Sequence, residues 1–138
     1  MGRYLSIDYG SKRCGIAVSD PQRIIASGLD TVASHELMHY LENYFKKEEV
    51  ELVVFGKPVK ENNTPSESFI LVERFVKAFK KKFPDKKTAW EDERYSSKLA
   101  VQAMIDGGMK KANRRKRENI DKMSAAIILQ SYMQQENN

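Results

Sequence analysis

The chain has 138 residues with 24 Lys and Arg against 19 Asp and Glu, and it contains a single cysteine, Cys14. One cysteine excludes an internal disulfide and a zinc finger. No apolar run reaches the roughly 20 residues that a membrane helix needs. We therefore expect one domain, residues 1–138, that folds around its own core in the cytoplasm without a membrane partner. The net charge of +5 favours a polyanionic partner such as nucleic acid.

The apolar pattern predicts three strands first and then mostly helices. In chain order it predicts strands at residues 3–9, 14–20 and 23–32, a helix at 34–47, a strand at 51–56, a helix at 67–83, a strand at 86–92, and helices at 96–105 and 120–135. The first two strands are joined by the turn GSKR, as in a hairpin. Ser34 is the expected N-cap of the first helix.

This order predicts an α/β fold with a five-stranded mixed sheet and helices on both faces. The first three strands are expected to form an antiparallel meander, and right-handed crossovers add the later strands in parallel. The first strand should be central, because it can pair with its hairpin partner on one side and with the strand at 51–56 on the other.

Acidic residues recur where this topology brings strand ends together. Asp8 ends the first strand, Asp92 and Glu93 end the last strand, and Asp121 begins the final helix. Two carboxylates about 5 Å apart repel by roughly 3 kcal/mol at an effective dielectric of 20, so a structural role alone does not explain such a cluster. Hard divalent cations such as Mg²⁺ or Mn²⁺ prefer these oxygen ligands. The cluster therefore predicts a site for one or two metal ions.

Each acid also has an ordinary structural explanation. Asp8 could form a turn, Glu93 could pair with Arg94 on the surface, and Asp121 could stabilise the start of a helix. Successive strand residues point to opposite faces, so only one of Asp92 and Glu93 can face the site, and we select Glu93.

Four segments together resemble a known family. DYGSKRCGIAVSD, FGKP, WEDERYSS and IDKMSAAIILQSY occur in this order over nearly the whole chain, and the set resembles the YqgF/RuvX family of the RNase H-like superfamily. The resemblance implies an RNase H-like fold and a divalent-metal-dependent nuclease that processes the 5′ end of precursor 16S ribosomal RNA. One motif departs from the family, because Asn62-Asn63 stand where relatives carry Asp-Gly.

The resemblance also implies roles for individual residues. The acids Asp8, Glu93 and Asp121 match the metal-binding and catalytic positions. Lys12 and Arg94 match basic positions that contact phosphate. Two further groups extend the predicted substrate surface from the residues themselves. They are Gly10, where a side chain would obstruct a phosphate approaching the first acid, and the cations of the run KKANRRKR at 110–117, among them Arg114, Arg115 and Arg117.

Other functions remain open from the sequence. The resemblance also implies a second role, because the family is related to Holliday junction resolvases, so branched DNA is the alternative substrate to structured RNA. A chain with a dead site would be an RNA-binding module, in which the basic run matters and the acids do not. ATP binding is a third class, because Asp-x-Gly before a hairpin also occurs in phosphate loops, but those proteins use two such domains. The sequence does not distinguish a monomer from a homodimer.

Overall fold

The computed structural model describes residues 2–58, 68–93, 107–108 and 116–136. Five strands form one sheet in the order β3-β2-β1-β4-β5. The strands are β1 (Arg3–Tyr9), β2 (Arg13–Ser19), β3 (Ala26–Ala33), β4 (Val50–Lys57) and β5 (Lys87–Asp92). The helices are the short 3₁₀ helix η1 (Ser34–Glu36), α1 (Leu37–Lys47), α2 (Ser68–Lys82) and α5 (Arg117–Glu136). The helix expected at 96–105 lies outside the described residues.

The strand pairing confirms the predicted topology. β2 runs antiparallel to both β1 and β3, which makes the meander. β4 runs parallel to β1, and β5 runs parallel to β4. β1 is therefore the central strand, and the carboxyl ends of β1, β4 and β5 meet at one edge of the sheet.

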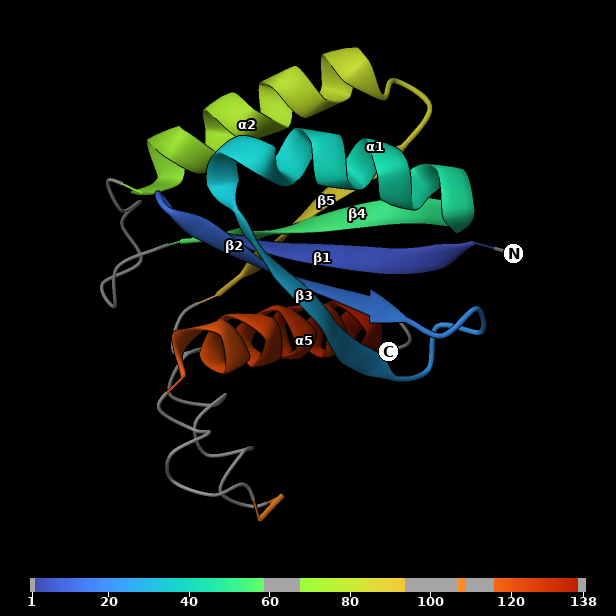
Figure 1. The fold of residues 1–138 in the computed structure, drawn as a ribbon. Coiled ribbons are helices and arrows are strands. Elements are labelled where there is room, and N and C mark those ends of the chain that lie inside the picture. The colour runs from blue at the N-terminus through green and yellow to red at the C-terminus, as the bar shows by residue number, and fades with distance from the viewer. Residues whose placement is uncertain (1, 59–67, 94–106, 109–115, 137–138) are drawn as a thin grey trace.

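The sheet is covered on both faces, as Figure 1 shows, by α1 and α2 on one side and by α5 on the other. Successive side chains of β1 point to opposite faces of the sheet and so pack into both cores. Leu5 and Ile7 are fully buried in the core beneath α1 and α2, whereas Tyr4 belongs to the core beneath α5. The Ser6 hydroxyl donates a 2.6 Å hydrogen bond to the Ala125 carbonyl of α5. Every second residue of β1 thus faces α5, and Asp8 continues that series.

The start of the first helix differs from the prediction. Ser34 opens η1, and α1 begins at Leu37 without a side-chain cap. The Ser34 hydroxyl donates to the Gly10 carbonyl over 2.6 Å and lies 3.4 Å from the Cys14 sulfur. The prediction of Ser34 as the N-cap is therefore wrong, because its hydroxyl bonds to the β1–β2 turn instead of to the helix. No helix within the described residues is long and apolar enough to span a bilayer.

Candidate metal site and nucleic-acid groove

Three acidic side chains come from three elements that meet at the carboxyl edge of the sheet. Asp8 is the penultimate residue of β1, Glu93 directly follows β5, and Asp121 lies in the second turn of α5. Asp8 is paired across the hairpin with Gly15, and a Cβ at Gly15 would collide with the backbone carbonyl of Asp121. The absence of a side chain at Gly15 therefore lets α5 approach the sheet beside Asp8.

Asp8 and Glu93 form one hydrogen-bonded unit. Burial, then the negative charge of Asp8 and the hydrogen bond to its carboxylate, raise the pKa of Glu93 to about 9. Asp92 adds a smaller contribution through its charge. In the absence of a cation, the pair therefore shares a proton at neutral pH instead of carrying two negative charges.

One oxygen of this pair has no hydrogen-bond partner in the part of the chain that the structure describes. Oε2 of Glu93 is buried, and among the described residues no donor reaches it. It lies against Gly56 of β4, where a Cβ would collide with this oxygen and would come within 2.9 Å of Ile128 Cδ1. A buried carboxylate oxygen without a donor is costly, and a hard cation is one group that satisfies it.

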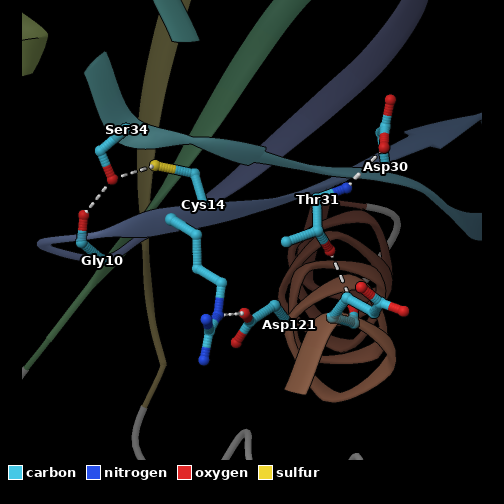
Figure 2. A network of polar contacts seen from close by, with 8 residues as sticks. Gly10, Cys14, Asp30, Thr31, Ser34 and Asp121 are labelled. Carbon is cyan, nitrogen blue, oxygen red and sulfur yellow. Dashed lines mark hydrogen bonds and ion pairs between the residues drawn. The ribbon is translucent and has the colours of Figure 1, made fainter. Parts of the chain in front are cut away.

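Asp121 is buried, with 8% of its surface exposed, and it is held by a cation from β2. The Arg13 Nε donates to Asp121 Oδ2 over 2.9 Å, and Figure 2 shows this ion pair at the labelled Asp121 carboxylate. The Asp121 side chain is 12% exposed and the Arg13 side chain 46% exposed. The third acid is therefore neutralised by an arginine that water can reach.

The donor set fits a hard divalent cation. It consists of carboxylates, one of which carries the unpartnered buried oxygen, and such oxygens suit Mg²⁺ or Mn²⁺. Within the described part of the chain, no three Asp, Glu, His or Cys side chains already stand in an arrangement that could hold a metal ion. The carboxylate of Asp121 is turned to Arg13. Binding a cation between all three acids therefore requires a local side-chain rearrangement.

Asp92 and Glu93 point to opposite faces of the sheet, and the structure shows which of the two lies on the side of α5. Asp92 is exposed, and strand alternation directs it to the face opposite α5. Glu93 lies on the α5 face and contacts Asp8. Of the two residues, Glu93 is therefore the one that lies beside Asp8.

The remaining predicted site residues fall into three groups. Gly10 has a structural reason to lack a side chain, because a Cβ would lie 2.5 Å from the Arg13 carbonyl oxygen in the same turn. Lys12 is exposed in that turn, one residue before Arg13. Arg117 is the first residue of α5, so it lies near the same edge. Arg94, Arg114 and Arg115 lie outside the described residues.

A groove beside the acids carries positive charge. It encloses about 600 Å³ between the β1–β2 turn, β3 and the start of α5. Its lining residues are Lys12, Arg13, Thr31, Val32, Ala33, Lys116 and Glu118. Three cations against one acid suit a segment of phosphate backbone.

Two residues near the site were missed by sequence reasoning. Arg13 is two positions before Gly15 on β2, so alternation alone would have placed it on the α5 face next to the acids. Glu91 is two positions before Glu93 and is buried on that same face, where it accepts hydrogen bonds from Ser131 at 2.6 Å and Gln135 at 3.2 Å. Its partners make it a tether between β5 and α5 instead of a site residue.

Comparison with known proteins agrees with this geometry. A protein of Christiangramia forsetii named "Putative pre-16S rRNA nuclease" is 50% identical over 133 residues, covering 96% of this chain and 98% of the relative. A protein of the same name from Bacteroides fragilis is 47% identical over 134 residues, covering 97% of each chain. Among solved structures, a fowlpox virus resolvase in complex with Holliday junction DNA superposes with a TM-score of 0.57 at 13% identity, over 99% of both chains, and so shares the fold. The family described as "RuvX: Holliday junction resolvase" matches residues 2–135, and the chain belongs to this family.

Proposed function

We propose that this protein is a divalent-metal-dependent nuclease that hydrolyses phosphodiester bonds in nucleic acid, and that its substrate is the 5′ end of precursor 16S ribosomal RNA. The observation that carries the proposal is the Asp8–Glu93 pair, in which the buried Oε2 of Glu93 lacks a donor among the described residues. The name carried by relatives about 50% identical supports the RNA substrate. Processing of ribosomal RNA would take place in the cytoplasm.

The proposed metal ligands are the carboxylates of Asp8, Glu93 and Asp121. An Mg²⁺ or Mn²⁺ ion bound there would supply a Lewis acid and lower the pKa of a water molecule for attack on phosphorus. Glu93 must first lose the proton that it shares with Asp8, because only the ionised carboxylate is a good ligand for a hard cation. Lys12 and the cations of the groove would hold the phosphate backbone in register with the acids.

The test is a cleavage assay on an RNA that contains the 5′ flank of 16S ribosomal RNA. We expect cleavage with Mg²⁺ or Mn²⁺ and none with EDTA. Asp8→Asn and Glu93→Gln should each reduce the rate by at least a hundredfold while circular dichroism shows a folded protein. Asp92→Asn is the matched control, since Asp92 is exposed next to Glu93, and it should keep a rate within a few fold of wild type. Failure to cleave with either metal would contradict the proposal.

A second candidate is resolution of Holliday junctions, because the family that matches residues 2–135 is described by that activity. A four-way junction has two-fold symmetry, so its cleavage at paired positions calls for two active sites and hence a homodimer. The same assay with a four-way DNA junction, together with the oligomeric state by sedimentation, distinguishes the two. Paired incisions by a dimer, with the ribosomal RNA left intact, would favour the resolvase.

A further inference from the structure

Arg13 links the acidic site to the basic groove. Its Nε lies 2.9 Å from Asp121 Oδ2, and its side chain also lines the groove with Lys12 and Lys116. One guanidinium thus borders both the acid that would bind a cation and the surface that would bind phosphate.

We propose that Arg13 is an exchangeable counter-ion: it neutralises Asp121 while the metal site is empty, and cation binding releases it to bind substrate phosphate in the groove. This inference rests on the proposed metal-dependent nuclease. It follows from the partners of Asp121, since the guanidinium and a divalent cation would compete for the same carboxylate. The two positive groups also repel each other, so that both cannot stay at Asp121 without cost.

The exposure of the two partners suits an exchange. Asp121 is 12% exposed and fixed to α5, whereas Arg13 is 46% exposed at the first residue of β2. Ion pairs that water reaches are weak, so a divalent cation with three carboxylate ligands can displace this one. The long arginine side chain would move away, and the Asp121 carboxylate would turn toward the other two acids.

The groove offers the released guanidinium a second partner. Lys12 and Lys116 give it positive charge, and Glu118 is the one acid among the described residues that line it. The hydroxyl of Thr31 donates to the Glu118 backbone carbonyl over 2.7 Å, which ties β3 to the start of α5 where both line the groove. A phosphate held there would draw Arg13 away from Asp121. Cation binding and nucleic-acid binding would therefore strengthen each other.

The first test measures Mn²⁺ binding without nucleic acid, from the loss of the free-ion signal in electron paramagnetic resonance. Arg13→Gln removes the competing charge and should tighten Mn²⁺ binding roughly three- to tenfold. Arg13→Lys keeps the charge and should change the affinity less. Lys12→Gln is the matched control, because it removes a neighbouring cation that does not pair with Asp121, and it should change Mn²⁺ affinity less than twofold.

The second test measures binding of an RNA hairpin in EDTA and again in Ca²⁺, with the hairpin checked for cleavage by gel. In EDTA, Asp121 holds Arg13, so Arg13→Gln should weaken binding less than threefold. In Ca²⁺ the same substitution should weaken binding about tenfold, since a charge-assisted phosphate contact is then lost. Lys12→Gln should cost the same factor under both conditions.

The outcomes separate this inference from the proposed function. Unchanged or weaker Mn²⁺ binding by Arg13→Gln, or an equal loss of RNA affinity with and without Ca²⁺, would overturn the exchange while leaving the metal site intact. If the wild-type protein bound no Mn²⁺ at all, the proposed metal site itself would fail, and the exchange with it.

Discussion

Replacing Glu93 by glutamine tests the acid pair at its most buried atom. Glutamine has nearly the size of a protonated glutamate, and its Nε2–H can donate to the Asp8 carboxylate as protonated Glu93 does. The variant therefore keeps the hydrogen bond but cannot ionise. Any difference between the two proteins that grows with pH then reports the ionisation of Glu93.

The sign and size follow from the pKa. Glu93 has an ordinary value of 4.5 and a value of about 9 in the folded, metal-free protein, so the folded state keeps a proton that the unfolded chain releases between these limits. The contribution of the protonated Glu93 to the free energy of unfolding is thus complete below pH 4.5 and is lost as pH rises toward 9. Each pH unit in that window costs up to about 1.4 kcal/mol. Between pH 5.5 and 8 the wild type should lose roughly 3 kcal/mol more than Glu93→Gln, equal to about 10 °C in Tm.

Urea unfolding in EDTA at the two pH values measures this difference directly. Asp92→Asn is the control, since it leaves Glu93 ionisable and should follow the wild type. Adding Mg²⁺ at pH 8 should stabilise the wild type and Asp92→Asn, because a cation that binds only the folded state stabilises it, and should leave the stability of Glu93→Gln nearly unchanged. Equal losses for wild type and Glu93→Gln between pH 5.5 and 8 would refute the buried, proton-sharing pair.

Three further substitutions test the packing of α5 that positions the third acid. Gly15→Ala should lower the free energy of unfolding by about 2–3 kcal/mol, since its Cβ would collide with the Asp121 carbonyl, and chemical denaturation would show no loss if α5 docked elsewhere. Ser124→Ala should raise the free energy of unfolding by about 1 kcal/mol, and Tm with it, because the buried Ser124 hydroxyl has no partner among the described residues. A lower Tm would mean that the hydroxyl is hydrogen-bonded in the folded protein. Ser131→Ala should cost about 1–2 kcal/mol in urea unfolding, because it removes the 2.6 Å hydrogen bond to buried Glu91, and an unchanged midpoint would argue against the tether.

The sheet could be predicted from the sequence because its strands carry unambiguous patterns. Arg3–Tyr9 was predicted at its observed bounds, and the strand order followed from chain order and the handedness of crossovers. The two faces follow from alternation, which is why Asp8 could be placed at the edge that Glu93 shares. Ser34 was less predictable, since a serine before a helix has several possible partners and the turn that it contacts is distant in sequence.

Side-chain partners at the site could not be derived in the same way. Lys12 and Arg13 are adjacent cations in one turn, and the sequence favours neither as the partner of Asp121, more than 100 residues away along the chain. The close approach of α5 at Gly15 decides which of the two pairs with Asp121, because it brings Asp121 over the strand that begins with Arg13. That contact depends on tertiary packing, and packing of this kind is not encoded in local residue patterns.

Glu91 and Glu93 show why position on a strand does not by itself identify a site. Both are glutamates on the α5 face, two residues apart, so alternation treats them as equivalent. Glu91 accepts two hydrogen bonds from α5, which satisfy a buried carboxylate, whereas Glu93 faces another acid and keeps an oxygen that no described donor reaches. A carboxylate with hydrogen-bond donors stabilises the fold, whereas one beside a second carboxylate is the candidate ligand for a cation. Whether a glutamate at this edge is structural or a candidate site residue therefore depends on its hydrogen-bond partners, and these become known only once α5 is packed on the sheet.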